Sequence, residues 1–200
     1  DINLAKSLAK IGCNVTLIAC GKCSIPNVNF IEIKHPLKFS IFERVLNKIG
    51  FKKFNQLRRN NKVDSWVATY IKTHKSLIDT KSVFIGRAGM SKYSFAEVKK
   101  HGALTVLHSS WMHPFTQQTI LHNEYNHLGI KSNPISKNRI ARQLKEIEQV
   151  DKIWCISNLV YNSYLNNNVA KDKLFLIFLG VDFKHYTISD IEDELYPQRE

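Results

Sequence analysis

Residues 103–114 have the sequence Ala-Leu-Thr-Val-Leu-His-Ser-Ser-Trp-Met-His-Pro, in which a short β-prone run gives way to imidazoles, hydroxyls and a proline. The run predicts a buried parallel strand, and Pro114 suits the first turn of a helix that we expect to extend to Leu128. In open α/β sheets, ligands bind beyond the carboxyl ends of strands, and a helix start there favours anions. The segment therefore predicts a binding site at the end of this strand.

Strand and helix patterns alternate along the rest of the chain. Further strands are predicted at residues 14–19, 29–33, 82–85, 152–156 and 173–178. Helices are predicted at residues 2–11, 93–101, 136–149 and 157–166. This alternation predicts an α/β fold with a doubly wound, Rossmann-like parallel sheet and helices on both faces. The first helix and strand form the second half of a βαβ unit, so we expect an upstream strand in a longer protein.

Positive charge is concentrated in the first half of the chain. Residues 1–100 hold 19 Lys and Arg against 6 Asp and Glu, whereas residues 101–200 hold 10 against 11. Residues 38–77 have a basic helical pattern, which we expect to break near Gly50 and Asn60-Asn61. The pattern fits a basic amphipathic helix on an anionic membrane, and it fits equally a helix whose apolar stripe packs on the sheet. The cations of this predicted anion or membrane patch are Arg44, Lys48, Lys52, Lys53, Arg58 and Arg59.

Several functional classes find little support in the sequence. No apolar run approaches the roughly 18 residues that span a bilayer and no signal peptide is recognisable, so we expect a cytoplasmic protein, at most peripheral to the inner membrane face. Cys20 and Cys23 form one CxxC, but turn-forming residues follow it and no second pair completes a zinc site. No acidic or histidine cluster predicts a metal site. Gly86 and Gly89 indicate a tight turn more than a phosphate loop.

Three stretches, taken in order, carry a family resemblance. Residues 110–125 are similar to a Gly-Ser-Ser-His loop followed by an Ile-Leu-x-Glu-Glu-Tyr helix, although Ser-Trp-Met replaces Gly-Ser-Ser. Residues 146–157 match a helix that ends near an acidic residue, followed by Asp-x-Ile and a Ser at the next helix. Residues 179–186 are similar to an Asn-Gly-Val-Asp crossover between domains, with Leu in place of Asn. The matching residues are His113, Ile120, Leu121, Glu124, Tyr125, Glu146, Asp151, Ser157, Gly180, Val181 and Asp182.

In this order the stretches resemble the N-terminal, acceptor-side domain of family 4 glycosyltransferases of the GT-B fold. The resemblance implies an acceptor-binding domain at 1–186, a linker or tail at 187–200, and a nucleotide-sugar domain outside this chain. The implied function is retaining transfer of a sugar from a nucleotide-sugar donor to a glycan, a lipid-linked acceptor or another cell-envelope acceptor. No cofactor or metal is expected to bind this chain itself.

The resemblance also implies roles for individual residues. His113 would face the transferred sugar or its leaving diphosphate, where an imidazole can hydrogen-bond and stabilise charge. A histidine that merely packs beside Pro114 is the alternative, and loop hydroxyls often bond only to backbone. The implied acceptor-binding residues are Arg87, His108, Ser109, Ser110 and Glu124.

Two other functions remain as alternatives. One is a non-catalytic basic module that binds nucleic acid or an anionic membrane, and the other is a GT-B sugar-nucleotide epimerase. Nucleic acid is not favoured, because the apolar residues follow helix and buried-strand periods instead of alternating with cations on an exposed sheet.

Overall fold

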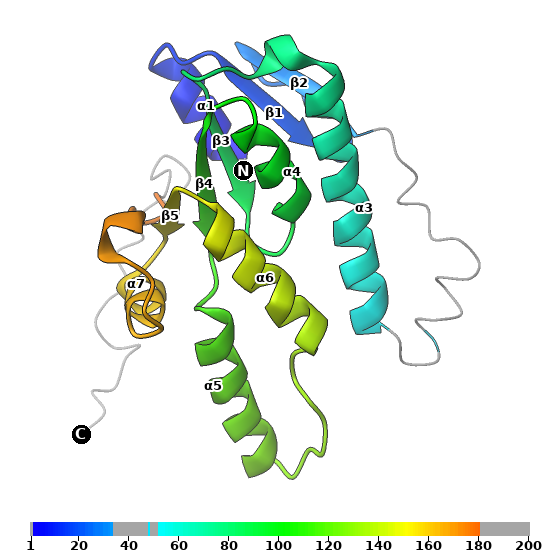
Figure 1. The fold of residues 1–200 in the computed structure, drawn as a ribbon, viewed down its shortest axis with the longest axis vertical. Coiled ribbons are helices and arrows are strands. Elements are labelled where there is room, and N and C mark those ends of the chain that lie inside the picture. Colours follow the sequence, from blue (N-terminus) through cyan, green and yellow to red (C-terminus); the bar gives the residue numbers. More distant parts are fainter. Residues whose placement is uncertain (1, 34–47, 49–51, 181–200) are drawn as a thin grey trace, which may run out of the picture.

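The computed structural model describes residues 2–33, 48 and 52–180 as a parallel α/β fold (Figure 1). The first two strands, β1 (Val15–Ala19) and β2 (Val28–Glu32), pair in parallel. A second parallel sheet has the order β3-β4-β5-β6. Its strands are β3 (Val83–Arg87), β4 (Leu104–Ser109), β5 (Lys152–Cys155) and β6 (Leu174–Leu176).

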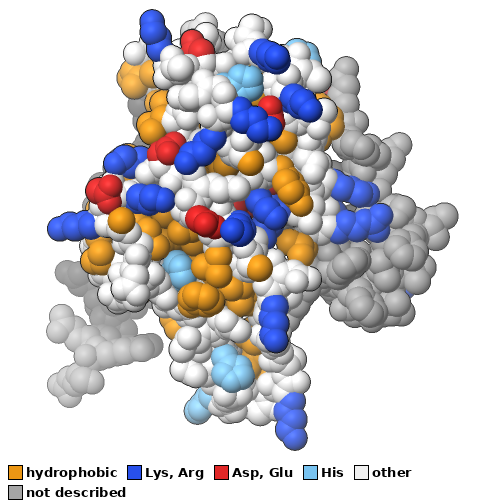
Figure 2. All heavy atoms as spheres, viewed as in Figure 1, with side chains coloured by type: hydrophobic (Ala, Val, Ile, Leu, Met, Phe, Trp, Pro, Cys, Tyr) orange, Lys and Arg blue, Asp and Glu red, His pale blue; other side chains and the backbone are white. Residues whose placement is uncertain are grey.

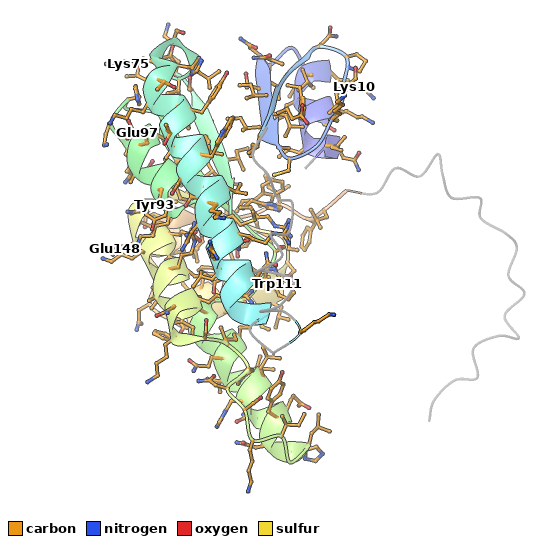
Figure 3. The ribbon with its side chains drawn as sticks, turned by 90° about the vertical axis from the view of Figure 1, so that its right-hand side faces the viewer. Lys10, Lys75, Tyr93, Glu97, Trp111 and Glu148 are labelled. Atoms are coloured by element: carbon orange, nitrogen blue, oxygen red, sulfur yellow. The ribbon has the colours of Figure 1, made fainter. Side chains whose placement is uncertain are left out.

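Helices cover both sides of these strands. The helix α1 lies on the opposite side of the strands from α3, α4 and α6 (Figure 3), which confirms the doubly wound α/β prediction. The helices are α1 (Ile2–Lys10), α3 (Lys52–Thr73), α4 (Lys92–Lys99), α5 (Pro114–His127), α6 (Lys137–Gln149) and α7 (Asn158–Leu165). Short 3-10 helices span Lys75–Leu77 and Lys171–Lys173.

Two apolar clusters hold the helices against the strands. The first lies under α4, α6 and α7. Burial of each large apolar side chain in it stabilises the folded state by about 1.5–3 kcal/mol. The other lies under α3 and α4 and also contacts Ile18 of β1 and Phe84 of β3. The first cluster contains Phe95, Leu107, Ile147, Val150, Ile153, Cys155, Val160, Tyr164 and Leu174.

The helix α3 continues through Asn60 and Asn61, so the predicted break at this pair is wrong. Asn side chains usually weaken helices because they compete for backbone hydrogen bonds. Here the Asn60 Nδ2 donates to the Gly89 carbonyl at 3.1 Å, and the Asn61 Oδ1 accepts from the Arg142 guanidinium. Both asparagine side chains therefore form hydrogen bonds with residues distant in the sequence. The other predicted break, at Gly50, lies outside the described residues.

A buried ion-pair network joins α3, α6 and the turn after β3. The Arg142 guanidinium contacts the Asp64 carboxylate and bonds the Glu146 Oε1 at 3.2 Å and the Gly89 carbonyl at 3.1 Å. Asp64 and Glu146 are fully buried and Arg142 is 5% exposed. Buried charges are tolerated when they are paired and hydrogen-bonded, as here.

The two carboxylates of this network also bind backbone amides. Glu146 accepts from the N–H groups of Gly89 at 2.5 Å and Ser91 at 2.9 Å. Asp64 accepts from the N–H groups of Tyr93 at 2.8 Å and Ser94 at 2.9 Å, so it caps α4 from a neighbouring helix. Burial raises the pKa of Glu146, and its amide hydrogen bonds and Arg142 oppose that rise.

Replacing Arg142 tests the network. Arg142→Met should lower the free energy of unfolding by roughly 3–5 kcal/mol, because two buried carboxylates lose their counter-charge. Arg139→Met, at an exposed position of the same helix, is the matched control and should stay within about 0.5 kcal/mol of the parent. Urea denaturation followed by circular dichroism measures both. Equal stability of the two variants would contradict the role given to Arg142.

Candidate functional site

The loops predicted to form the site meet at one edge of the sheet. Because β3 and β4 are parallel, the turn at residues 86–89 and the loop at 108–114 leave the sheet on the same side, as predicted. Arg87, His108 and Trp154 occupy one row across β3, β4 and β5. Gly180 follows β6 at this edge, whereas Val181 and Asp182 lie outside the described residues.

His108 is half-buried, and its imidazole lies beside Trp154 of β5. Its ring centroid lies 4.4 Å from that of Trp154. Burial, together with the charge of Arg87, lowers the pKa of His108, so the ring is neutral at pH 7. Within the described part of the chain, its buried Nε2 has no hydrogen-bond partner. A buried polar atom without a partner is costly, and a ligand group could satisfy it.

His113 is 3% exposed and caps α5. Its Nδ1 accepts from the Phe115 N–H at 3.4 Å, which leaves the proton of the neutral ring on Nε2. Its own N–H donates to the Ser163 Oγ at 2.9 Å, and its ring meets Tyr164 edge-on at 5.4 Å. Burial lowers the pKa of His113. These contacts give His113 a structural role, and its catalytic role stays a prediction.

The loop after β4 and the start of α5 are held by residues of α7 and of the turn that follows it. The Ser109 Oγ lies 2.8 Å from both the Trp111 carbonyl and the Tyr164 hydroxyl. The Asn167 Nδ2 donates to the Thr116 Oγ1 at 2.8 Å, in the first turn of α5. The hydroxyl of Ser109 is thus engaged inside the protein, while Ser110 beside it is half-buried.

Glu124 lies apart from the other predicted site residues. It is an exposed residue on α5, ten positions after Pro114, or about 15 Å along a helix. The helix projects away from the sheet (Figure 1). The structure therefore brings Arg87 and His108 to neighbouring strand ends and places His113 in the following loop, but it does not bring Glu124 to them.

The glycines after β3 make a tight turn. A Cβ on Gly86 would lie 2.6 Å from the Phe95 ring, and Gly89 has a φ of +80°, which favours glycine. The amides of Gly89 and Ser91 already donate to Glu146. Since those donors are used internally, the turn has the structural role that the sequence favoured over phosphate binding.

Exposed aromatic residues at the same edge form a feature that sequence reasoning missed. Trp111 is 49% exposed, Phe115 is 48% exposed and Phe178, which follows β6, is 61% exposed. Figure 2 shows hydrophobic side chains gathered where α5 leaves the body of the domain. The signal in the sequence is that Trp111 and Phe115 lie in the segment between a predicted strand and the next helix, and that Phe178 ends the last predicted strand. A contiguous patch of exposed apolar groups is what marks a surface for a partner or ligand, so this edge is a candidate for one.

The predicted anion or membrane patch is described only in part. Lys48 is exposed, Arg58 and Arg59 are half-buried on α3, and Arg44 lies outside the described residues. Lys52 and Lys53 lie in the first turn of α3, but their side chains are not described. Figure 2 shows cationic side chains dispersed over one face of the domain. The described residues fit both interpretations of the patch: a surface for an anionic membrane, and a helix whose apolar stripe packs on the sheet.

Two kinds of feature are not found among the described residues. None of their helices combines the length and apolarity needed to cross a membrane. Nor do three or more His, Cys, Asp or Glu side chains gather in these ranges as a metal site would require. Comparison of the chain with family models, with curated proteins and with solved structures gives no match.

The lowered pKa values of His108 and His113 predict a dependence of stability on pH. At about one pH unit above the ordinary histidine pKa of roughly 6.5, these rings are mostly neutral in both the folded and the unfolded state. As the pH falls below that value, the unfolded state takes up protons first, because the folded pKa values are lowered, so the free energy of unfolding decreases. Urea denaturation at pH 7.5, 6.5 and 5.5 should show this loss.

One variant measures how much of this loss of stability comes from His113. His113→Asn keeps a side chain that can cap α5 but cannot titrate in this range. Its stability should fall less than that of the parent between pH 7.5 and 5.5. A fall of the same size in both proteins would show that protonation of His113 does not oppose folding.

Proposed function

We propose that this chain is the acceptor-binding half of a retaining glycosyltransferase that uses a nucleotide-sugar donor. The observation that carries the proposal is the convergence of Arg87, His108 and the His113 loop at the carboxyl edge of a parallel α/β sheet. The order of sequence motifs along the chain adds independent support. The acceptor class is a glycan, a lipid-linked acceptor or another cell-envelope acceptor.

The groups at the edge suit the charge changes of such a transfer. Retaining transfer develops positive character on the sugar and negative charge on the departing diphosphate. A neutral His113 with its proton on Nε2 can donate a hydrogen bond to developing negative charge. The exposed Arg87 adds a fixed cation, and the unpartnered His108 Nε2 offers one more polar contact for an acceptor. Exposed aromatic groups around them would be covered by ligand or by a second domain.

The donor side of the proposal lies outside this chain. A second domain would hold the nucleotide and the sugar, and neither a metal nor another cofactor is assigned to the chain. The proposed location is the cytoplasm, with contact to the inner membrane face if the acceptor is lipid-linked. The crossover at Gly180, Val181 and Asp182 would lead into that second domain.

Sugar transfer should require both this chain and the donor-binding domain. The 200-residue chain alone should release no nucleoside diphosphate from a panel of nucleotide sugars. Joined to its donor-binding domain, the protein should transfer sugar, and His113→Ala should then lower kcat by about 100-fold or more. Coupled detection of the released nucleoside diphosphate measures both.

Two matched variants separate catalysis from helix capping. His113→Asn preserves a cap, so a purely structural role predicts near-normal kcat for Asn and a defect for Ala only. A role in charge stabilisation predicts a loss in both. His122→Ala, at an exposed histidine of the same helix, should leave kcat unchanged. A joined protein that folds but transfers no sugar would overturn the proposed function.

Membrane contact by the basic segment can be tested separately. Charge reversal at Lys48, Lys52 and Lys53 should weaken binding to vesicles containing acidic lipid by about 100-fold or more, because each cation near the surface contributes about 1 kcal/mol. Reversal at the exposed Lys131, Lys137 and Lys171 makes the same net charge change elsewhere and should have a smaller effect. Sedimentation with neutral and acidic vesicles measures both. Equal effects would remove the membrane claim.

A further inference from the structure

A cavity of about 660 Å³ opens between α3 and the start of α4. Its volume falls within the roughly 300–1,000 Å³ of pockets that bind small molecules. Tyr93, in the first turn of α4, lies beside α3 at this point (Figure 3). The described residues that line the cavity are Leu57, Arg58, Asn61, Lys62, Ser65, Trp66, Thr69 and Tyr93. None of these residues belongs to the strand-end loops of the candidate site.

Positive charge surrounds this cavity. Arg58 is half-buried and Lys62 is exposed, and both line it. A third cation, Lys92, has its Nζ 5.2 Å from the centroid of the Tyr93 ring. None of the described lining residues is Asp or Glu, and Asp64 of the same helix is fully buried in the ion-pair network. A concave surface with one sign of charge attracts ligands of the opposite sign, so the cavity favours an anion.

Two aromatic side chains give the cavity flat apolar walls. Trp66 is half-buried and Tyr93 is 39% exposed. Tyr70 stacks on one face of the Trp66 indole, with the two ring centroids 5.1 Å apart. A ligand ring can therefore stack only on the opposite face of that indole. Flat rings bind to aromatic side chains in this way, and nucleic acid bases do so whatever their identity.

The polar part of the lining is held in place from below. The Asn61 Oδ1 accepts from the Arg142 guanidinium, so this side chain can offer only its Nδ2 donors to the cavity. The neighbouring Asn60 Nδ2 donates to the Gly89 carbonyl at 3.1 Å. Both bonds tie this part of α3 to the turn after β3. The cavity wall is therefore preorganised, which lowers the cost of ordering it around a ligand.

We propose that this cavity binds an organic phosphate that carries a flat ring, of which a nucleotide is the simplest example. The phosphate lies against Arg58 and Lys62, and the ring lies against Trp66 and Tyr93. Lys62 and Trp66 are one helical turn apart, so the charged and aromatic parts of the cavity are neighbours on α3. The site is separate from the sheet edge, and the proposal does not depend on the transferase assignment.

Calorimetric titration of the 200-residue chain with ATP tests the proposal. Adenosine and inorganic triphosphate serve as the two halves of this probe. ATP should bind about tenfold or more tightly than either half, because only ATP supplies both charge and a stacking ring. A single-stranded oligonucleotide of about ten residues offers the same chemistry from a second source. The tighter of ATP and the oligonucleotide identifies the source.

Two pairs of variants assign the binding to this cavity. Arg58→Glu should weaken ATP binding by about tenfold or more. Arg139→Glu makes the same change of charge at an exposed position of α6 and should have a much smaller effect. Tyr93→Leu removes the flat ring and should also weaken binding about tenfold, whereas Tyr93→Phe keeps the ring and should bind as the parent does. Circular dichroism checks the fold of each variant.

Three results would overturn the proposal. ATP that binds no more tightly than inorganic triphosphate would show that charge alone is recognised. Equal weakening by Arg58→Glu and Arg139→Glu would show attraction to the net charge of the protein instead of to this cavity. Equal affinities of Tyr93→Leu and Tyr93→Phe would show that no ring stacks there. If Arg58→Glu fails to fold, the two Tyr93 variants still decide the question.

Discussion

The Arg142 guanidinium lies between two fully buried carboxylates that come from different helices and that together bind four backbone amides. Loss of the cation would leave Asp64 and Glu146 as uncompensated buried charges, which the protein interior does not tolerate. The ion pairs require α3 and α6 to approach the turn after β3 together. This single constraint fixes the course of the chain between β3 and α4.

The candidate site depends on that constraint from one side and on α7 from the other. Glu146 holds the turn that follows Arg87. Ser163 and Tyr164 of α7 hold the loop that contains His113, and Asn167, just beyond α7, bonds the first turn of α5. Both strand-end loops are therefore positioned before any ligand binds. Such preorganisation is what charge stabilisation at a reacting group requires. The sheet edge thus has the rigidity that the proposed transfer chemistry needs.

The sequence predicted the alternation of strands and helices because both periods are local properties. Ser136 and Ser157 were recognisable as helix starts, and each hydroxyl accepts from a backbone N–H in the structure. The pairing of Asp64 with Arg142 could not be predicted, since 78 residues separate them. The spacing of Arg142 and Glu146, one helical turn apart beside an apolar stripe, was the available signal.

Other differences between the predictions from sequence and the structure also have long-range causes. The Asn60-Asn61 pair continues a helix only because Gly89 and Arg142 engage its side chains. Ile120 and Leu128 keep helical spacing, yet they are 42% and 65% exposed because α5 projects from the sheet. Helical spacing indicates a common face but not whether another element covers it.

The most direct test of these ideas is amide hydrogen exchange at the turn after β3 in the 200-residue chain. Loop amides ordinarily exchange fast, because they open locally without unfolding the domain. If buried carboxylates hold this turn, the amides of Gly89, Ser91, Tyr93 and Ser94 should exchange as slowly as those of the central strand β4. Exchange of these four amides at the rate of the exposed loop at residues 131–133 would contradict the claim that the Arg142 network organises the sheet edge.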